Sequence, residues 1–560
     1  MAGVNPYASA GATPAAQALS TYKHPSQLAS ARLRLSPNRL LYPPGTPVIS
    51  DKLYSGFVEH LGRGIYGGIV DLPTDPSPAD LLEPQPRGRL GWRKDVMRIM
   101  SKELEMPILR WPGGNFVSNY HWQDGIGPLE KRPKRIELAW GSTESNLFGT
   151  DEFIDYCRGL NVEPYLCLNM GTGTYEEALA WLEYCNGTGD TYWANLRRQN
   201  TGRDEPHNVR YWGLGNEVHG AWQVGAMSAT DYTTMAKRWA HGLKLVDPSI
   251  MLVSCGNQGN SEWDREVLSG LIGVIDLHSI HLYTMLGHDR YSDTAGFEYE
   301  KNVFGAAAAE RGIEICSSLI QLAKIERAGQ VLDWSKRDDE VAARDVKICY
   351  DEWNVWDEVK APANNGLEQT YDFVDMLGVA AWLHVLVRKH REVGMACIAQ
   401  SVNVISPLMT SRDGLLFQTT YWPLQLFARH MKGGHLLNLG YCGELYTGPT
   451  YPTWIRHMAP PPYVDLLGMT GSDGIRLSII NRHPTSHWLC QLDLEEFTAE
   501  QVEMHEVYAD DLAAANTFEK PEVVVPKVKS LTVAELLSAG LDVKPHSFVF
   551  LIIKGRSNAT

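Results

Sequence analysis

The sequence has neither a long hydrophobic run nor an excess of positive charge. Its most apolar long window, Val374 to His390, contains Asp375 and His384 and is shorter than the roughly 20 apolar residues that a membrane span needs. The 560 residues include 51 basic and 66 acidic side chains, a net charge of -15, which argues against nucleic acid as a partner. We therefore expect no membrane insertion, no nucleic-acid binding and a neutral ligand.

Paired cysteine motifs and an N-terminal secretion signal are also missing. Nine cysteines are scattered over residues 157–490 without a CxxC pair, which predicts neither a disulfide framework nor a zinc cluster. Residues 1–29 lack the basic start and apolar core of a secretory signal, so we interpret them as a disordered leader and expect a cytoplasmic protein. Glycosylation triplets at Asn186 and Asn558 point the other way, although such triplets are common by chance. Secretion is therefore left open.

The chain contains eight β-rich runs that alternate with segments of helical period. The runs are 62–70, 106–114, 161–170, 208–217, 249–258, 274–283, 346–354 and 396–405. Such alternation is typical of parallel strands joined by crossover helices, and eight repeats in about 350 residues predict a closed barrel. We assign residues 51–420 to an α/β fold, an eight-stranded (β/α)8 TIM barrel.

The sequence pattern changes after Tyr421. Short alternating strands separated by Gly, Pro and Asp turns predict an antiparallel β-sandwich, jelly-roll-like, over residues 421–560. The early segment 31–45 also alternates, so residues 30–50 are predicted to add an N-terminal strand to that sandwich before the chain enters the barrel.

Two glutamates stand where barrel strands end. Glu217 closes the fourth run and Glu352 closes the seventh, and active sites of such barrels lie at the C-terminal ends of the strands. Two opposed carboxylates about 5 Å apart suit double displacement at a glycosidic bond, whereas about 6.5 to 9.5 Å would leave room for an inverting water. Asp351 precedes Glu352 on an extended strand, so it is predicted to face the opposite side. The spacing of the carboxylates is left open.

The longer motifs around these glutamates resemble those of one family. The stretches "RWPGGNFVSNYHWQDGIGP", "WGLGNEVHGAWQVG", "YDEWNVW" and "AQSVNVISPLMT" occur in this order on successive strands. From about residue 30 to its end, the chain resembles an α-L-arabinofuranosidase of glycoside hydrolase family 51. The resemblance implies that Glu217 is the acid/base and Glu352 the nucleophile, that no cofactor or metal takes part, and that the enzyme is a homo-oligomer, often a hexamer in relatives.

Further cavity residues follow from matching motifs. The resemblance implies that Glu59, Asn115, Asn216, Tyr283 and Gln400 hydrogen-bond the furanose hydroxyls and that Trp140 and Trp356 form aromatic walls. Arg110 is a candidate cationic partner of Glu352, and His281 is a candidate for tuning either carboxylate. Structural interpretations stay open, since Arg110 and Asn115 could brace the "WPGGN" turn, Trp140 could be core and Gln400 could satisfy backbone groups. Leu282 and Trp111 look like variants of the family pattern.

These motifs predict a retaining, exo-acting α-L-arabinofuranosidase that releases terminal units from arabinoxylan- or arabinan-derived oligosaccharides. The alternatives are another retaining glycosidase on the same barrel, such as an endoglucanase or a β-xylosidase, or a carbohydrate-binding protein without turnover. The proline-rich stretch 71–88 is predicted to be a loop on the catalytic face, either a wall beside the leaving group or a solvated insertion.

Overall fold

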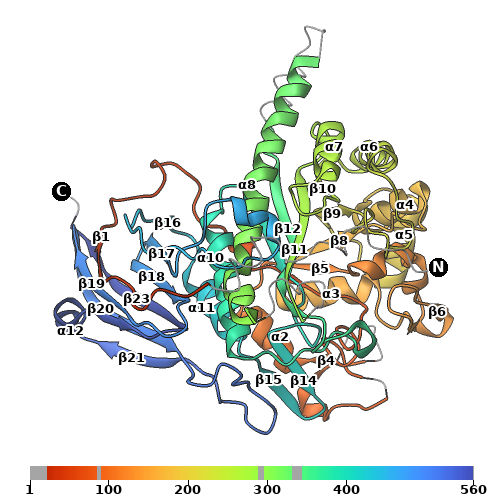
Figure 1. The fold of residues 1–560 in the computed structure, drawn as a ribbon. Helices are drawn as coiled ribbons and strands as arrows, with labels where there is room; N and C mark the ends of the chain where they lie inside the picture. The colour runs from red at the N-terminus through yellow and green to blue at the C-terminus, as the bar shows by residue number, and fades with distance from the viewer. Residues whose placement is uncertain (1–21, 73, 85–89, 288–295, 331–343, 559–560) are drawn as a thin grey trace, which may run out of the picture.

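The structure is a computed structural model that describes residues 22–558 except 73, 85–89, 288–295 and 331–343. Its centre is a ring of eight parallel strands (Figure 1). In chain order these are β2 (Gly56–Phe57), β5 (Ile108–Trp111), β8 (Glu163–Cys167), β9 (Tyr211–Leu214), β10 (Met251–Ser254), β11 (Leu277–Leu286), β12 (Lys347–Asp357) and β13 (Val393–Ile398). The ring closes where Ser55 N–H donates to the Ala396 carbonyl at 3.0 Å and Ile398 N–H donates to the Ser55 carbonyl at 3.1 Å. The predicted TIM barrel is confirmed.

Helices follow every strand of the ring. They are α2 (Lys94–Arg98, continued by a π-helical turn Ile99–Glu103), α3 (Thr150–Leu160), α4 (Tyr175–Asn186), α5 (Tyr192–Thr201), α6 (Ala229–Val246), α7 (Glu262–Leu271), α8 (Glu298–Gln330), α10 (Phe373–Arg388) and α11 (Tyr421–His430). Thr174, Ser261 and Asp372 begin α4, α7 and α10 as N-caps, and in each case an acidic residue three positions later returns a hydrogen bond to the cap. These capping boxes satisfy backbone N–H groups that the first turn leaves free.

The first barrel strand was misplaced by the sequence pattern. Residues 62–70 form turns, and the strand is Gly56–Phe57. The apolar side chains of 62–70 are buried, but positive φ angles at Gly62 (51°) and Gly67 (84°) fold this segment back on itself. The eighth strand begins at Val393 and stops at Ile398, so the second half of the predicted run 396–405 is a turn region.

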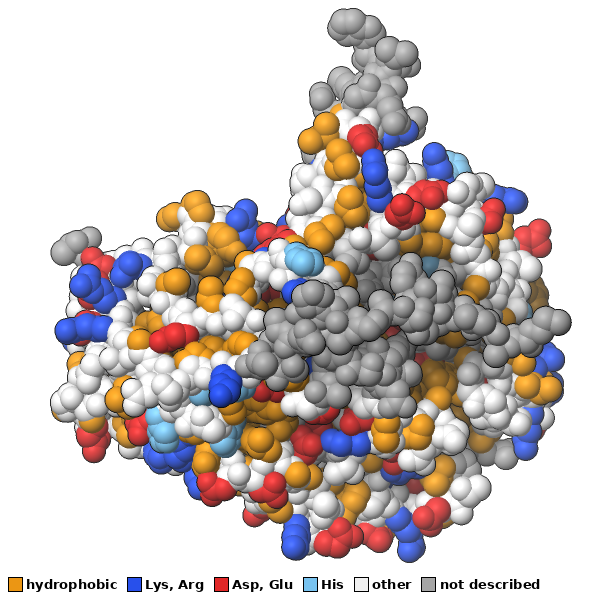
Figure 2. Space-filling view, in the orientation of Figure 1, with side chains coloured by type: hydrophobic (Ala, Val, Ile, Leu, Met, Phe, Trp, Pro, Cys, Tyr) orange, Lys and Arg blue, Asp and Glu red, His pale blue; other side chains and the backbone are white. Residues whose placement is uncertain are grey.

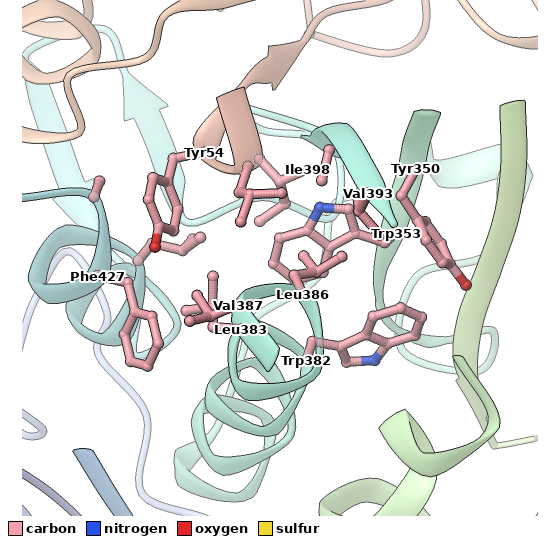
Figure 3. Close-up of a cluster of buried hydrophobic side chains, with 14 of the residues drawn as sticks. Tyr54, Tyr350, Trp353, Trp382, Leu383, Leu386, Val387, Val393, Ile398 and Phe427 are labelled. Carbon is pink, nitrogen blue, oxygen red and sulfur yellow. The ribbon is translucent and has the colours of Figure 1, made fainter. Parts of the chain in front are cut away.

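The apolar window around residues 374–390 is helix α10, which is buried on nearly all sides. It packs between barrel strand β12 and strands of the C-terminal sheet, so a helix that is hydrophobic all round lies in the core. Figure 3 shows its Trp382, Leu383 and Leu386 beside Trp353 of the barrel, whose ring lies 5.7 Å from that of Trp382. Among the described residues, no helix has both the length and the apolar content for crossing a membrane.

The C-terminal part contains two sheets. The six-stranded sheet has the order β16 (His435–Leu436), β17 (Val464–Gly471), β18 (Gly474–Asn481), β23 (Ser547–Ser557), β20 (Phe497–Val507) and β21 (Lys527–Leu531). The three-stranded sheet consists of β1 (Ala31–Leu35), β19 (Trp488–Leu494) and β22 (Leu541–Val543), with α12 (Val533–Ala539) packed against β19. β1 pairs in parallel with β19, whereas the other pairs in the two sheets are antiparallel. The boundary between the barrel and the C-terminal domain, predicted at residue 421, lies later in the chain, because residues 421–430 form the eighth barrel helix.

Short hairpins decorate the barrel. They are β3 (Leu82–Glu83) with β4 (Trp92–Arg93), β6 (Arg135–Ile136) with β7 (Thr143–Glu144), and β14 (Leu408–Ser411) with β15 (Gly414–Phe417). Within the proline-rich stretch 71–88, residues 82–83 are therefore a short strand, and the Pro76 carbonyl accepts from Arg412 Nε at 3.2 Å. Residues 73 and 85–88 of this stretch lie outside the described part of the chain.

The last eight residues of the predicted leader, 22–29, are ordered. Residues 1–21 lie outside the described residues, but residues 22–29 contact the C-terminal part. His24 binds Glu300 Oε1 through Nε2 at 2.7 Å and Tyr463 through Nδ1 at 2.9 Å, and Leu28 N–H donates to Ser486 at 2.9 Å. Polar partners on both sides explain why this segment is ordered although its sequence reads as a leader.

Two surface features bear on the expectations above. The Asn186 side-chain amide donates to the Val209 carbonyl at 2.9 Å and to Asp247 at 2.8 Å, so the first glycosylation triplet has its asparagine tied into the fold. The far end of α8 projects beyond the neighbouring helices (Figures 1 and 2), and its Leu322 and Ile325 are exposed there.

Candidate active site

Glu352 lies on β12 and receives hydrogen bonds at both oxygens. Arg110, at the end of β5, donates from Nη1 to Glu352 Oε1 at 2.7 Å, and the Tyr283 hydroxyl donates to Oε2 at 2.8 Å. Both donors hold the Glu352 carboxyl group in one orientation. Arg110 Nη2 also donates to Asn216 Oδ1 at 2.5 Å. The structure thus brings together the predicted nucleophile, its cationic partner and the amide next to the other glutamate.

Glu217 lies in a turn just beyond β9 rather than in the strand. The turn has positive φ at Gly215 (82°) and at Glu217 itself (45°), a conformation that costs a residue with a Cβ about 1 to 3 kcal/mol and that clusters at functional sites. Its Oε1 lies 3.0 Å from His281 Nδ1, and its Oε2 accepts from Trp222 Nε1 at 3.1 Å. The carboxylate is therefore fixed from two sides.

The two glutamates approach each other closely. One oxygen of Glu217, one oxygen of Glu352 and one ring nitrogen of His281 all lie within 4.8 Å of one another. Retaining glycosidases have carboxyl groups about 5 to 5.5 Å apart, and inverting enzymes need about 6.5 to 9.5 Å. Of the two spacings that the sequence left open, the structure has the shorter.

Asp351 does not face away from Glu352, and the prediction from strand alternation is wrong. Its Oδ2 lies 3.3 Å from Nε of Arg110, the guanidinium that binds Glu352, and its Oδ1 lies 3.1 Å from His281 Nε2. The pairing of β12 with β13 shifts register over residues 350–353, and such an irregularity turns successive side chains toward one side. Asp351 thus supports both Arg110 and His281 from within the barrel.

His281 carries a proton between the acidic groups. Burial alone would lower the pKa of His281, but the negative charge of Glu352 and hydrogen bonds to Asp351 and Glu217 raise it to about 10. The imidazolium therefore stands between the two glutamates at neutral pH, with Nδ1 3.7 Å from Glu352 Oε2.

The pKa of Glu217 departs from the expectation for an acid catalyst. An acid that is protonated near neutral pH needs a raised pKa. Burial does raise the pKa of Glu217, but the hydrogen bond and charge of His281 outweigh burial and bring it below its ordinary value. In the free enzyme the proton of this pair therefore resides on the imidazole. The expectation failed because the sequence does not show that His281 reaches Glu217.

A buried pocket wall beside Glu352 is built from Glu59 and Gln400. Glu59 Oε1 accepts from Phe116 N–H at 2.9 Å and from Trp140 Nε1 at 3.0 Å, and Glu59 Oε2 accepts from Gln400 Nε2 at 3.1 Å. Burial, together with the charge of Glu352, raises the pKa of Glu59 to about 7. Three of the predicted sugar-binding residues thus form one hydrogen-bonded group.

Gly114 lies among three polar side chains of the site. A Cβ at this position would lie 2.9 Å from Glu352 Oε1, 3.2 Å from Glu59 Oε2 and 3.5 Å from Asn216 Nδ2. Asn216 Nδ2 is buried and has no hydrogen-bond partner in the protein, so it is a donor in need of an acceptor. Two carboxylates and a free amide around a glycine can bind a sugar through its hydroxyls while a carboxylate reaches the anomeric carbon.

Comparisons with known proteins agree with this chemistry. Residues 100–301 match the sequence model of the α-L-arabinofuranosidase 1 domain, and residues 351–547 match that of the α-L-arabinofuranosidase C-terminal domain. The α-L-arabinofuranosidase C of Emericella nidulans is 46% identical over 494 residues, which cover 86% of this chain and 91% of the relative. The chain belongs to the α-L-arabinofuranosidases of glycoside hydrolase family 51.

Two bacterial relatives extend the comparison. The solved GH51 α-L-arabinofuranosidase from Thermotoga petrophila has a TM-score of 0.77 at 34% identity, and the match covers 93% of this chain and 100% of that one. The intracellular exo-α-(1→5)-L-arabinofuranosidase of Halalkalibacterium halodurans is 33% identical, over 82% of this chain and 87% of the relative.

The remaining predicted residues of this arabinofuranosidase lie around the same pocket. Trp140 and Trp356 pack with Tyr283 against one hydrophobic cluster, and the Trp356 ring lies 6.1 Å from the Tyr283 ring. Trp356 Nε1 donates to the Ala361 carbonyl at 2.9 Å, which fixes the indole. Asn115 follows Gly114 in a short 3-10 turn, Asn115–Asn119, and is half-buried.

Trp222 is a site residue of this arabinofuranosidase that the sequence interpretation missed. Its indole N–H donates to Glu217 although the side chain is 64% exposed. A Cβ at Gly220 would lie 2.4 Å from the Trp222 ring, so the ring rests directly on that glycine. The signal was present in "NEVHGAWQVG", where Trp222 follows the acid/base by five positions, but a tryptophan alone does not distinguish an exposed platform from core.

The site of this arabinofuranosidase also holds three groups of metal-ligand type. Glu217, His281 and Glu352 each direct one donor atom into the same small space. An imidazolium has no lone pair for a metal, and Arg110 already neutralises Glu352. The arrangement suits proton transfer between carboxylates better than metal binding.

Proposed function

We propose that this arabinofuranosidase is a retaining, exo-acting enzyme that removes terminal α-L-arabinofuranosyl units from arabinoxylan- or arabinan-derived oligosaccharides. The observation that carries the proposal is the close approach of Glu217 and Glu352, whose nearest oxygens lie within 4.8 Å. This distance leaves no place for an inverting water between carboxylate and sugar.

In the first half-reaction, a Glu352 oxygen attacks the anomeric carbon while the bond from that carbon to the leaving oxygen breaks. His281 passes a proton to Glu217 across their 3.0 Å contact, and Glu217 gives a proton to the leaving oxygen, so that Glu217 is a carboxylate again when the bond has broken. As Glu352 becomes an ester it loses its charge, which removes a major cause of the high pKa of His281. Proton release by His281 is thereby coupled to bond cleavage.

In the second half-reaction, water enters from the leaving-group side and attacks the anomeric carbon of the ester. Glu217, whose pKa is held low, takes a proton from that water, and Glu352 leaves as the carboxylate bound by Arg110 and Tyr283. Two inversions give net retention. The low pKa of Glu217 suits this base role.

The exposure of the pocket residues supports exo action. Glu59, Asn216 and Gln400 are each no more than 3% exposed and form a closed end, whereas Trp222 beside the acid/base is open to solvent. One sugar therefore fits the closed end, and the leaving group extends past Trp222. The printed name of the Halalkalibacterium halodurans relative, an exo-α-(1→5)-L-arabinofuranosidase, supports the same proposal.

Stereochemistry tests the mechanism directly. We expect proton NMR of early hydrolysis products to show α-arabinofuranose before mutarotation. Replacing Glu352 with Ala should lower kcat by several orders of magnitude, and azide should rescue it as β-arabinosyl azide, because azide attacks the α-linked substrate once. An initial β product from the wild-type enzyme, or near-normal turnover by Glu352→Ala, would reject the mechanism.

Activity on different substrates tests the proposed specificity against the alternative functions. The wild-type enzyme should hydrolyse 4-nitrophenyl α-L-arabinofuranoside and release arabinose from linear and branched oligosaccharides. Preference for the corresponding xyloside, or for cellulose, would favour the β-xylosidase or endoglucanase alternatives. Isothermal titration that shows sugar binding without turnover would favour a non-catalytic protein.

We also propose a cytoplasmic, oligomeric enzyme. All nine cysteines are free thiols and eight of them are buried, which is typical of a reducing compartment. The exposed Leu322 and Ile325 at the projecting end of α8 are candidates for a subunit contact. Cell fractionation and light scattering on the purified protein test the two statements; a secreted protein or a monomer would reject them.

A further inference from the structure

A buried polar chain lies behind the sugar pocket and touches none of the reacting groups. It runs from Trp111 through His60 to Glu144. Trp111 Nε1 donates to His60 Nε2 at 3.0 Å, and His60 Nδ1 lies 2.8 Å from Glu144 Oε2. The side chains of His60 and Glu144 are 1% and 7% exposed. Nothing in the reaction described above uses this chain.

The hydrogen bonds allow His60 only one tautomer. An indole N–H can only donate, so His60 Nε2 must accept, and the ring proton must then reside on Nδ1 and face Glu144. Burial raises the pKa of Glu144, but His60 and further donors outweigh burial and lower it, so the acceptor is ionised. The Tyr66 hydroxyl donates to its other oxygen at 2.7 Å. Asn146 N–H also donates to that oxygen at 2.6 Å, so both oxygens of Glu144 and both nitrogens of His60 have hydrogen-bond partners.

His60 also contacts the segments that carry the pocket. It follows Glu59 directly, and its backbone N–H donates to the Pro112 carbonyl at 3.2 Å. Its ring stacks on Phe116 with centroids 4.6 Å apart and planes 16° apart. The Phe116 N–H donates to Glu59 Oε1 at 2.9 Å. A shift of His60 would therefore move both Glu59 and the turn around Gly114.

We propose that His60 is a positioning residue of the sugar pocket. Through Trp111 and Glu144 it fixes the end of β2 to the loop after β5, and through Phe116 it sets the place of Glu59 relative to the bound arabinofuranosyl unit. The inference rests on the proposed function, because it concerns the binding of that sugar.

Two variants separate the two links of His60. The Nδ1 position of histidine corresponds to the amide end of Asn, and the Nε2 position to the amide end of Gln. His60→Asn can therefore keep the bond to Glu144, and His60→Gln can keep the bond from Trp111, but neither keeps both. Trp111→Phe removes the N–H donor but keeps an aromatic ring. It replaces the His60 variants in the experiment if these fail to fold.

A second buried histidine of the protein, His207, serves as a matched control. Its Nε2 lies 3.0 Å from Asp151 Oδ1, its side chain is 2% exposed, and Asp151 also accepts from the Tyr184 hydroxyl at 2.8 Å. This is the same buried arrangement of histidine, carboxylate and tyrosine, but it joins α3 and α4 on the outside of the barrel. Because this bond is made through Nε2, His207→Asn removes it and therefore reports the effect of losing such a bond on stability alone.

We expect His60→Asn and His60→Gln to lower kcat/KM for 4-nitrophenyl α-L-arabinofuranoside by about 10- to 100-fold, the scale of a misplaced binding group. They should also weaken arabinose binding in titration calorimetry. His207→Asn should lower the melting temperature comparably and leave both quantities near wild type. Combined with Glu59→Gln, the His60 substitution should have a much smaller effect than alone, because it acts through Glu59.

Equal effects of the His60 and His207 variants on kcat/KM and arabinose affinity, or full additivity with Glu59→Gln, would overturn the inference. If Trp111→Phe stands in for the His60 variants, unchanged arabinose affinity would do the same. A wild-type enzyme that binds arabinose but does not cleave the arabinoside would instead reject the proposed function, while the binding measurements would still decide the role of His60.

Discussion

At the scale of single residues, Glu217 combines two tasks that need opposite protonation states. Its pKa is low because His281 donates to it, which suits the base of the second step, and the histidine supplies the proton for the first. Glu217→Ala should therefore leave attack by Glu352 intact but remove leaving-group protonation.

The expected consequence of Glu217→Ala is dependence on the leaving group. Substrates with good aryl leaving groups should keep much of the first step, natural oligosaccharides should lose it, and the basic limb of the pH profile should vanish. Stopped-flow measurement of aryl release, compared with arabinose release from oligosaccharides, checks this. Equal losses on both substrate types would contradict the assignment of Glu217.

The raised pKa of Glu59 predicts that substrate binding depends on pH. Burial and the charge of Glu352 raise its pKa from an ordinary value of 4.5 to about 7, so it gains its charge only as the pH rises through about 7. An ionised carboxylate accepts sugar hydroxyls better than a protonated one. KM for the aryl arabinoside should therefore fall as pH increases from 6 to 8, about one unit on either side of that pKa. In Glu59→Gln this dependence should disappear.

The same shift predicts an effect of Glu59 on stability. A carboxyl group with a raised pKa in the folded state binds its proton more tightly there than in the unfolded chain, so stability decreases as pH rises from about 4.5 to about 7. Glu59→Gln removes this loss. The melting temperature of the variant relative to wild type should consequently be higher at pH 8 than at pH 5, and a constant difference across this range would contradict the raised pKa.

At the scale of elements, the irregularity in β12 places two consecutive carboxylates of this strand, Asp351 and Glu352, on the same side. It directs Asp351 and Glu352 toward Arg110, which a regular strand could not do. Burial raises the pKa of Asp351, but Arg110 and His281 outweigh it and hold this pKa far below its ordinary value. The aspartate therefore stabilises the fold in its charged form.

Asp351→Asn should destabilise the enzyme by about 3 to 5 kcal/mol at neutral pH, the usual cost of leaving a buried cation without its partner. A carboxylate with a lowered pKa contributes its stability above the ordinary value near 3.8 and loses it as pH falls. Urea unfolding should accordingly show that the difference between wild type and variant shrinks below about pH 4. A difference that stays constant down to pH 3 would contradict the ionised state.

Several elements could be predicted from the sequence because local patterns determine them. Seven of the eight barrel strands lie within or overlap the predicted runs, since their apolar runs end at turn residues. The run 62–70 was wrong because its buried isoleucines are carried by turns, and apolar content alone does not distinguish a buried turn from a strand.

At the scale of the whole molecule, a buried ionic cluster joins the barrel to the C-terminal sheets. Asp465 of β17 is bound by Arg388 of α10, and it lies 3.3 Å from His384 Nδ1 and 3.6 Å from Arg482 Nη2. Burial raises the pKa of Asp465, but Arg388 and these neighbours outweigh it and bring the pKa far below its ordinary value. One carboxylate thus neutralises cations from both parts.

Asp465→Asn should lower the stability of the whole chain by about 3 to 5 kcal/mol, because the buried Arg482 loses its ion-pair partner and Arg388 keeps only Glu310. Barrel and sheets share α10 as core, so both should unfold in one transition. Near-ultraviolet circular dichroism and residual activity, followed through the same thermal scan, should coincide. A first transition that removes sheet structure while activity persists would show that the two parts are independent.

The sequence by itself predicted the barrel, the C-terminal sheets and the two glutamates that the structure brings together, because strand runs and the motifs at their ends are local in the chain. Only the tertiary structure decided how far apart the glutamates stand, that His281 holds the proton next to Glu217, and that Trp222 is exposed beside Glu217. The first two properties depend on distances between residues dozens to more than a hundred positions apart, and the third depends on burial, which local sequence does not show. Such distances, and the burial that shifts each pKa, arise only when the ring of strands closes.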